Sequence, residues 1–254
     1  MSATLQGNSI LAQKVAFALK DAFDVHVPVI ALLSELELGD IVGFIRGECS
    51  LESLKPVDWD SEATIDETLT FQQSEGDGEV LLTGSTGHVG AAVLEALLHE
   101  SANRPVCCLV RAASNEDALR RVVDTLVSRG YDDAAARAES GDGVRCVAGD
   151  LSVPLLGLDE AQFDALAKST SVILNVGCWV HHLATYRMLK ASNVGSVATL
   201  LRLASIGPRT RFVQVSTTSA RSGAAGGGYS QSKWVAERMV DEAVKRGLDG
   251  AVLQ

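Results

Sequence analysis

Two side chains suited to proton transfer, Tyr229 and Lys233, are four residues apart in the sequence. Residues at positions i and i+4 share one face of a helix, so we expect the phenol and the ammonium group to lie close together. A nearby positive charge favours the phenolate and lowers the pKa of a tyrosine from its usual value of about 10. The pair predicts that Tyr229 donates a proton to a carbonyl oxygen that becomes negative during a reaction. The alternative is an unrelated pair on a surface helix, where this spacing also occurs by chance.

Hydroxyl side chains precede this pair, in the segment Val215-Ser216-Thr217-Thr218-Ser219 at the end of an apolar run. If the run is a strand, the hydroxyl of Thr217 could donate a hydrogen bond to the same carbonyl oxygen. These hydroxyls could instead do no more than cap the end of the strand.

A glycine-rich turn follows the first apolar run of the longer, C-terminal part of the chain, and it reads Gly84-Ser85-Thr86-Gly87-His88-Val89-Gly90. Its three glycines permit a tight turn, close approach of a pyrophosphate, and close packing of the next helix on the strand. A helix that starts near Gly87 offers free N–H groups and its positive dipole end to phosphate. Because the motif follows a strand and opens a helix, it indicates dinucleotide binding rather than glycines used only for turning.

The second apolar run ends in Leu109-Val110-Arg111, where the adenosine ribose of a dinucleotide would lie. Sites that prefer NAD usually place an acidic residue there, whereas a guanidinium suits a 2′-phosphate. Arg111 therefore favours NADPH over NADH. The alternative is that Arg111 is a solvated charge at the end of a strand.

Short apolar runs alternate with amphipathic stretches from Glu79 onward. The expected strands span residues 79–83, 105–110, 143–148, 171–175, 211–216 and 250–254, and the expected helices lie near residues 88–100, 114–129, 159–168, 183–204 and 230–246. The runs are almost continuously apolar, as in strands buried on both faces. This repetition predicts an α/β fold, a Rossmann-like doubly wound parallel sheet.

The composition excludes several classes of protein. Hydrophobic residues make up 46% and charged residues 21% of the 254 residues, which argues against wholesale disorder and collagen-like repeats. No apolar run approaches the roughly 20 residues of a membrane span, and the N-terminus has no signal-peptide pattern. The net charge of −10 argues against a nucleic-acid partner, which would require a basic face.

The cysteines are odd in number, and four of them lie in apolar, strand-like runs; they are Cys49, Cys107, Cys108, Cys146 and Cys178. This pattern favours reduced, buried thiols in a cytoplasmic protein over disulfides or a metal site. The adjacent His181 and His182 have no third ligand at a suitable spacing, so we expect no metal there.

Ten acidic residues and one lysine lie between Glu48 and Glu79, which accounts for nine of the ten net negative charges. Like charges at this density repel one another and keep a segment solvated. We therefore expect residues 48–78 to be an acidic linker between a short domain, residues 1–47, and a long one, residues 79–254.

Several motifs of the long domain belong together: TGSTGHVG, CLVRA, GDLSVPLLGL, ASNVGSVATLLRLA, VSTTS and GGYSQSKWVAERMV. Together they resemble the thioester reductase domains that end some non-ribosomal peptide and polyketide synthases, and that carboxylic acid reductases and aminoadipate reductases share. These domains belong to the extended short-chain dehydrogenase/reductase superfamily. The resemblance covers nearly all of residues 79–254, and YSQSKWVAE is its most specific part.

The resemblance implies the roles of the site residues. Thr217, Tyr229 and Lys233 match the catalytic trio, and Lys233 also holds the nicotinamide ribose. The glycine-rich turn and Arg111 match the NADPH contacts. Asp150 and Leu151 match the pair beside the adenine. The implied activity is NADPH-dependent reductive release of a carrier-bound acyl or peptidyl thioester as an aldehyde, and a second hydride transfer would give an alcohol.

The chain departs from the family pattern at two places. The turn after the fourth strand reads Asn175-Val176-Gly177-Cys178, where the family has an Asn–Gly–Ala-like turn with asparagine at the position of Val176. Only eleven residues separate Thr217 from Tyr229, where relatives have a longer loop that faces the substrate. We expect cofactor binding to survive both changes, and the second change bears on where the catalytic hydroxyl lies.

Residues 1–47 contain an amphipathic helical pattern that begins at Ser9. By itself Ser9 is a good helix N-cap. The segments GNSILAQKV and VHVPVIALLSELELGDIVGFI resemble the second half of an acyl or peptidyl carrier domain, in which the serine matched by Ser9 carries 4′-phosphopantetheine. The usual preceding aspartate is absent, with Thr4 near its place, and the helix that should come before is missing. We therefore expect a partial, helical carrier remnant.

The order carrier, linker, reductase indicates that upstream synthase modules deliver the thioester on a tethered arm, which raises its effective concentration. One alternative is another enzyme of the extended superfamily, such as a nucleotide-sugar epimerase or dehydratase. Arg111 and Ser9 argue against it. The other is a non-catalytic NADP-binding fragment, because relatives continue beyond Gln254 into a substrate-binding subdomain.

Overall fold

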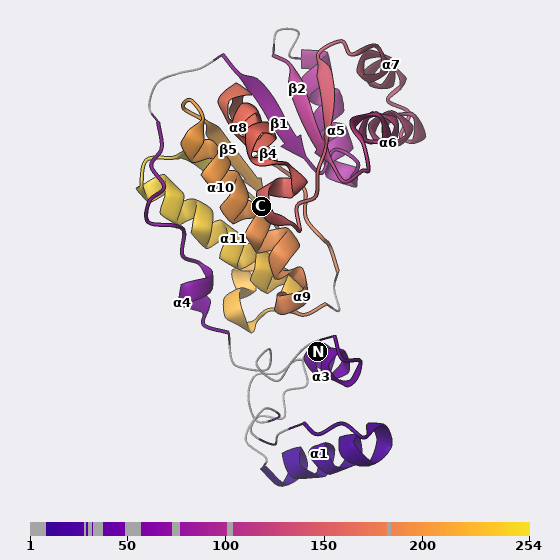
Figure 1. Ribbon diagram of the computed structural model, residues 1–254, viewed down its shortest axis with the longest axis vertical. Coiled ribbons are helices and arrows are strands. Elements are labelled where there is room, and N and C mark those ends of the chain that lie inside the picture. Colours follow the sequence, from indigo (N-terminus) through magenta and orange to yellow (C-terminus); the bar gives the residue numbers. More distant parts are fainter. Residues whose placement is uncertain are drawn as a thin grey trace.

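The computed structural model describes residues 9–27, 29, 32, 38–48, 57–72, 77–100, 104–181 and 184–254 (Figure 1). Its centre is a six-stranded, fully parallel sheet with the strand order β3-β2-β1-β4-β5-β6. The strands are β1 Glu79–Thr83, β2 Val106–Val110, β3 Val144–Ala148, β4 Thr170–Asn175, β5 Arg211–Val215 and β6 Asp249–Leu253. All six expected strands are present, and the predicted doubly wound fold is confirmed.

Helices cover both faces of the sheet, and alternate residues of each strand enter different cores. Leu82 of β1 belongs to a core with the first group of helices, α5 His88–Glu100, α6 Asn115–Ser128 and α7 Asp132–Ser140. Leu81 belongs to the opposite core with the second group, α8 Glu160–Ser169, α10 Ser196–Ile206 and α11 Gly228–Lys245. This burial on two sides explains the continuous apolar runs of the sequence.

Two helical segments differ from the expectation. Helix α7 is absent from the predicted elements, because it buries only the small side chains Ala134, Ala135 and Ala138 and so lacks a strong apolar period. The long helix expected over residues 183–204 is interrupted. It consists of α9 Tyr186–Lys190, a π-helical turn at Ala191–Gly195, and α10, while residues 182 and 183 lie outside the described part of the chain.

The prediction of a solvated acidic linker is wrong for residues 57–72, which we call the docked segment. Ala63 and Ile65 are buried in the same core as α10 and α11. The ring of Trp59, in the short helix α4 Trp59–Glu62, packs edge-on against Tyr186 and Trp234, with centroids 5.0 and 5.8 Å apart. Apolar anchors outweigh the repulsion between like charges because the segment lies on a folded surface that offers both core and counter-charges.

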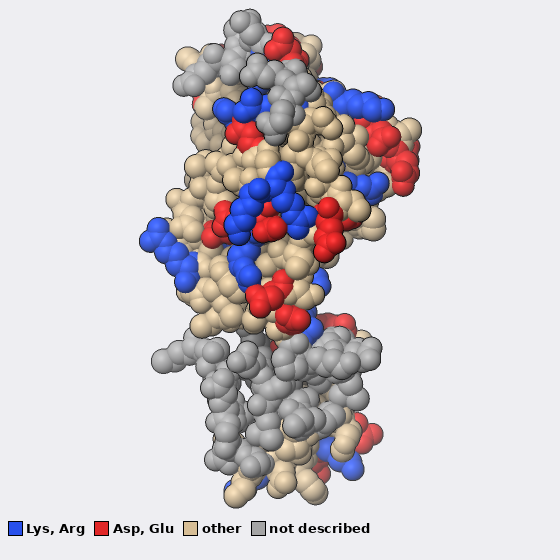
Figure 2. All heavy atoms as spheres, turned by 90° about the vertical axis from the view of Figure 1, so that its left-hand side faces the viewer, with Lys and Arg blue, Asp and Glu red and all other residues tan. Residues whose placement is uncertain are grey.

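Those counter-charges come from the helices beneath the docked segment. Glu62 pairs with Lys190, and Asp60 pairs with Arg238. The side of the molecule that carries α11 and this segment shows basic and acidic side chains interspersed (Figure 2). The domain boundaries at residues 47 and 79 stay a prediction, but the acidic stretch is in part an integral piece of the α/β unit.

The N-terminal part forms helices α1 Ser9–Phe23 and α3 Leu38–Ile45 around a small core of its own, made by Ala12, Val27, Leu32 and Ile41. Ser9 is the first residue of α1, but its side chain and residues 1–8 lie outside the described part. The carrier remnant and the attachment of 4′-phosphopantetheine to Ser9 therefore stay predictions. Among the described residues, no helix is both long and apolar enough to cross a membrane.

Candidate active site

A cleft of about 440 Å³ opens at the carboxyl ends of β1, β2 and β4. The chain runs outward from β1 through β2 to β3 and then returns to place β4 on the other side of β1. Such a reversal in strand order is where open α/β sheets bind their ligands. The cleft is lined by Gly84, Thr86, Leu109, Val110, Arg111, Arg121, Gly149, Asp150, Leu151, Ser152, Gly177, Cys178, Trp179, Met188, Ala191 and Ser192.

Glycine is required at two positions of the turn between β1 and α5. Gly84 has a φ of +75°, and a Cβ atom there would lie 2.6 Å from the backbone nitrogen of Gly177. A Cβ atom on Gly90 would lie 2.0 Å from the carbonyl oxygen of Gly84. Both distances are too short for any side chain. The spacing of the glycines therefore produces a compact turn that directs the N-terminus of α5 toward the cleft.

The turn after β4 lies directly against this glycine turn. The backbone N–H of Gly177 donates to Oγ1 of Thr83 at 2.9 Å, and Thr83 donates to Oδ1 of Asn175 at 2.6 Å. The departure from the family pattern at Val176 therefore leaves the two turns joined at the floor of the cleft.

Five of the predicted cofactor residues line the cleft, namely Gly84, Thr86, Arg111, Asp150 and Leu151. They come from the ends of β1, β2 and β3, which are far apart in sequence and adjacent in the sheet. The other predicted residues of the turn, Ser85, Gly87, His88, Val89 and Gly90, are outside this lining. Nδ1 of His88 lies 2.7 Å from Nη1 of Arg129. Cofactor contacts stay a prediction for all ten of these residues, including the five that line the cleft.

Arg121 lines the cleft beside Arg111, although it was not among the predicted cofactor residues. Its guanidinium donates a hydrogen bond to the carbonyl oxygen of Arg111, so α6 adds a second cation at the end of β2. Nearby, burial works to raise the pKa of Asp150, but hydrogen bonds from Ser152 and the charge of Arg111 outweigh it and hold that pKa below its usual value. Two guanidinium groups at this edge suit an anionic group such as a 2′-phosphate.

Two members of the predicted catalytic trio, Tyr229 and Lys233, are on α11, and the third, Thr217, follows β5. Tyr229 lies in the first turn of that helix, and its Oη is 3.9 Å from Sγ of Cys178. Nζ of Lys233, whose side chain is buried, donates to the carbonyl oxygen of Val215 at 2.6 Å. Oγ1 of Thr217 accepts from the backbone N–H of Ser219 at 3.3 Å. Thr217 is thus the cap of the turn that follows β5, which is the structural role that the sequence left open for it.

The electrostatics at Tyr229 differ from the expectation. Burial, and then the neighbouring Cys178 thiol, raise the pKa of Tyr229 above its ordinary value of 10. Burial lowers the pKa of Lys233. The expected lowering of the phenol's pKa by Lys233 is not found in this structure, because the causes that set this pKa, burial and the Cys178 thiol, both raise it. Tyr229 therefore keeps its proton at neutral pH, which is the state a proton donor needs.

The short loop between Thr217 and Tyr229 folds onto α11. Residues Thr218–Ala225 form a 3₁₀ segment, and Nε2 of Gln231 donates to the carbonyl oxygen of Ala224 at 2.9 Å. A Cβ atom on Gly223 would be in ordinary contact with the ring of Trp234. The loop that is longer in relatives is here held against the helix that carries Tyr229.

Cys178 and Asn193 are further residues of the site that the sequence did not assign to it. Cys178 lines the cleft and contacts Tyr229. Asn193 is buried in the π-helical turn and bonds both the N–H and the carbonyl of Trp179, at 2.7 and 3.1 Å. The sequence did not indicate Asn193 as a site residue, because a regular α-helix without the π turn would place its side chain on a different face.

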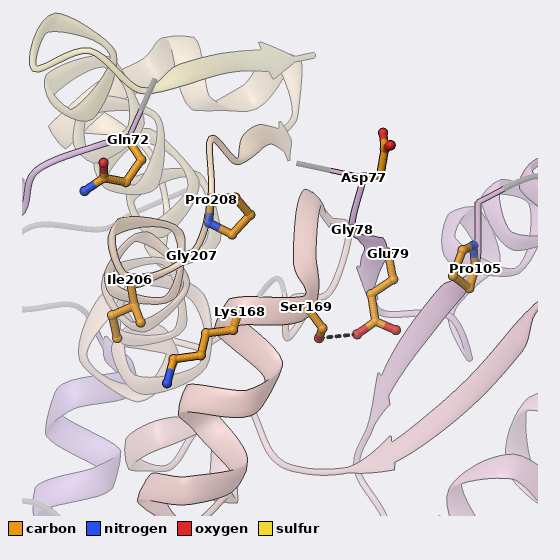
Figure 3. A pocket seen from close by; sticks show the side chains of 10 residues that line it. All are labelled: Gln72, Asp77, Gly78, Glu79, Pro105, Lys168, Ser169, Ile206, Gly207 and Pro208. Carbon is orange, nitrogen blue, oxygen red and sulfur yellow. Dashed lines mark hydrogen bonds between the residues drawn. The ribbon is translucent and has the colours of Figure 1, made fainter. Parts of the chain in front are cut away.

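A larger cavity of about 770 Å³ lies at the opposite, amino-terminal edge of the sheet (Figure 3). The carboxylate of Glu79 in its wall already has partners within the protein, because it accepts hydrogen bonds from Arg145 and from Oγ of Ser169, the latter at 2.6 Å. Ligands of doubly wound sheets bind at the carboxyl ends of the strands, so this cavity is not the cofactor site. Among the described residues no group of three or more His, Cys, Asp or Glu side chains could hold a metal, and the four described cysteines are free thiols.

Known proteins resemble this chain along most of its length. L-2-aminoadipate reductase of Schizosaccharomyces pombe is 28% identical over 98% of the chain and 21% of its own length. A linear gramicidin synthase of Brevibacillus parabrevis is 31% identical over 97% of the chain and 5% of its own length. The chain therefore spans only a small part of these curated relatives.

Solved structures agree in fold. The terminal R domain from the myxalamid PKS-NRPS biosynthetic pathway superposes with a TM-score of 0.70 at 31% identity, over 78% of this chain and 55% of that one. The reductase (R) domain of a nonribosomal peptide synthetase from Mycobacterium tuberculosis gives 0.60 at 29% identity, over 80% and 52%. Residues 82–227, which hold the glycine turn, Arg111 and Thr217, match the NAD-binding family described as male sterility protein. The chain belongs to that family of NAD-binding reductase domains.

Proposed function

We propose that this chain is part of a thioester reductase that uses NADPH to release a carrier-bound acyl or peptidyl group as an aldehyde. The observation that carries the proposal is the meeting of three features at one edge of the sheet: the glycine turn, the Arg111–Arg121 pair, and Tyr229 beside the cleft. The similarity to aminoadipate reductase and to R domains of peptide synthetases supports it.

The residues of the cleft fit NADPH. The turn at Gly84 has no side chain in the path of a pyrophosphate, and the N-terminus of α5 attracts its charge. Arg111 and Arg121 would hold the 2′-phosphate, and Asp150 with Leu151 would lie beside the adenine. When bound, NADPH supplies the hydride that reduces the thioester carbonyl carbon.

The chain's own residues would then handle the charge that develops on the carbonyl oxygen. Tyr229 holds a proton on Oη and donates it to that oxygen, while the hydroxyl of Thr217 donates a hydrogen bond. Lys233 would hold the nicotinamide ribose next to Tyr229. Breaking of the carbon–sulfur bond then releases the aldehyde, while the hydroxyl proton passes to the sulfur and gives the thiol of the carrier arm. A further NADPH would supply the hydride for reduction of that aldehyde to an alcohol.

The partners in this proposal are the carrier-bound thioester and the upstream modules of a synthase. A 4′-phosphopantetheine arm on Ser9 would need only to swing to the cleft, so that tethering raises the effective concentration of the thioester. The free thiols of Cys107, Cys108, Cys146 and Cys178 suit a cytoplasmic location, where such thiols stay reduced.

The test is to incubate the full chain with NADPH and an acyl-pantetheine thioester, and to follow NADPH oxidation together with trapped aldehyde. Tyr229→Phe should lower turnover by about 10²- to 10⁴-fold, the usual contribution of a general acid, while NADPH affinity stays within about twofold. Tyr131→Phe is the matched control, because Tyr131 lies at the start of α7 and outside the cleft, and it should leave turnover unchanged.

The other outcomes separate the alternatives. Failure to bind NADPH at millimolar concentration would contradict the whole proposal. Binding with no turnover, also in a chain extended at both ends, would favour a non-catalytic cofactor-binding module. Stronger binding of NADH than of NADPH would favour another enzyme of the extended superfamily.

A further inference from the structure

Glu62, in the docked segment, holds a helix that lines the cleft. Its Oε2 accepts a hydrogen bond from Oη of Tyr186 at 2.5 Å, and its Oε1 accepts from Nζ of Lys190 at 2.8 Å. Tyr186 and Lys190 are the first and last residues of α9. One carboxylate from outside the nucleotide-binding fold therefore fixes both ends of this five-residue helix.

The two contacts differ in strength. The side chain of Lys190 is half-exposed, so solvent screens its ion pair with Glu62. Tyr186 is buried, and a hydrogen bond between a buried phenol and a carboxylate is charge-assisted and poorly replaced by water. Burial first, and then Glu62, raise the pKa of Tyr186 far above its ordinary value, so its hydroxyl stays a donor. The Tyr186 contact is therefore the one that matters for the position of α9.

Helix α9 touches the site on two sides. Met188 of α9, with Ala191 and Ser192 of the π turn that follows, lines the cleft. The start of α9 also lies against Gly228, the residue before Tyr229. A Cβ atom on Gly228 would lie 2.4 Å from the backbone nitrogen of Tyr186. A shift of α9 would therefore change both the wall of the cleft and the packing contact at the start of α11, the helix that carries Tyr229.

The π turn extends this connection to the other wall. Asn193 in the turn bonds the backbone of Trp179, next to Cys178, and its Nδ2 also donates to Oγ of Ser232 at 3.0 Å. Ser232 in turn donates to the carbonyl oxygen of Tyr229 at 2.8 Å. These hydrogen bonds, of which the one between Asn193 and Ser232 is buried, join the segment after β4 to the first turn of α11.

We propose that Glu62 is a positioning residue for the cleft, acting through Tyr186, α9 and Asn193 on the placement of Cys178 and Tyr229. Its effect on placement is independent of the reaction, whereas its effect on turnover rests on the proposed function. The chain between the N-terminal helices and the sheet is then part of the site's support as well as a connection.

The first experiment measures placement without any catalysis. The rate at which iodoacetamide alkylates Cys178 in the full chain is followed by mass spectrometry of the peptides. Glu62→Ala and Tyr186→Phe should each raise that rate at least about threefold, because local opening exposes the thiol. Asp60→Ala is the matched control: Asp60 is on the same short helix and pairs with Arg238, but its side chain is almost fully exposed, so the rate should stay within about twofold.

Two readouts separate positioning from general destabilisation. Cys107 and Cys108 are fully buried in the two cores, so their labelling should stay slow unless the whole fold opens. Glu62→Gln gives up the negative charge but keeps an oxygen that accepts from Tyr186, so it should restore most of the slow labelling of Cys178. Unchanged labelling in Glu62→Ala, or Glu62→Gln labelled as fast as Glu62→Ala, would overturn the proposal.

The second experiment measures turnover. In Glu62→Ala, kcat should fall several-fold with a smaller change in the KM for NADPH, and Glu62→Gln should recover most of it. A wild-type chain with no thioester reduction would contradict the proposed function, and the labelling of Cys178 would still decide the role of Glu62. Normal turnover in Glu62→Ala, together with slow labelling of Cys178, would contradict a positioning role for Glu62.

Discussion

The choice between phosphorylated and unphosphorylated cofactor depends on single side chains at the end of β2. Arg111 follows the strand directly, while Arg121 reaches the same place from α6 and donates to the carbonyl oxygen of Arg111. Asp150, the nearest predicted carboxylate, follows the neighbouring strand β3 and lines the same cleft. The balance of two cations and one anion favours a ligand with extra negative charge at the ribose.

Replacement of Arg121 by alanine tests this balance. We expect Arg121→Ala, like Arg111→Ala, to weaken NADPH binding by about 10- to 100-fold, since a hydrogen bond to a charged group contributes about 1.5–3 kcal/mol. NADH binding should change by less than about threefold. Fluorescence titration with both cofactors gives the two affinities.

The neighbouring Arg120 provides the control. It is on the same helix and mostly exposed, and it pairs with Asp117, so Arg120→Ala should leave both affinities unchanged. An equal loss of NADH and NADPH affinity in Arg121→Ala would contradict a role at the 2′-phosphate.

At the scale of elements, the site depends on close approach between helices α9 and α11. Gly228 opens α11 and touches the backbone of residues 184–186, whereas its neighbour Gly227 has open space where a Cβ would be. Two adjacent glycines therefore have different requirements. Gly228 needs the absence of a side chain, and Gly227 is only a helix cap.

Substitution of each glycine by alanine should separate these requirements. A Cβ on Gly228 would lie 2.4 Å from three backbone atoms, so Gly228→Ala should lower the free energy of unfolding by about 1–3 kcal/mol, the usual cost of overpacking. It should also reduce turnover, because Tyr229 is the next residue. Gly227→Ala should change stability by less than about 0.5 kcal/mol. Urea unfolding measures both, and equal effects would contradict the packing argument.

The helices and strands also show what the periodicity of apolar residues can and cannot predict. The six strands were predictable because their apolar runs report burial on both faces. Helix α7 was not, because alanines bury little area and leave no clear period. The π turn at Ala191–Gly195 changes which residues face the site, and a pattern of 3.6 residues per turn does not reveal an extra residue in one turn.

At the scale of the whole molecule, the α/β unit begins before its first strand. The docked segment buries Ala63 and Ile65 and places Trp59 between Tyr186 and Trp234. Arg246 also donates to the carbonyl oxygen of Asp66 at 3.0 Å. A domain cut at residue 79, the predicted boundary, would leave this surface of α10 and α11 uncovered.

Trimming tests the boundary. A chain of residues 79–254 should be less stable than one of residues 57–254 by at least about 3 kcal/mol, because burial of one large apolar side chain contributes about 1.5–3 kcal/mol. In the full chain, Ile65→Ala should cost about 2–4 kcal/mol and the exposed Glu67→Ala less than about 0.5 kcal/mol. Equal midpoints of urea unfolding for the two trimmed chains would contradict the docking of this segment.

The sequence alone determined the class of the fold and the place of the cofactor turn, because both follow from local rules. The fold class follows from the period of the apolar residues, and the turn follows from the spacing of glycines at positions where a side chain would not fit. Only the tertiary structure decided the rest. Tyr229 and Cys178 are 51 residues apart, and Glu62 and Tyr186 are 124 residues apart. Such distant neighbours also bury the phenol of Tyr229, bring Arg121 to the cleft and hold the docked segment. Desolvation and counter-charges come from residues that are close in space, and these need not be close in the sequence.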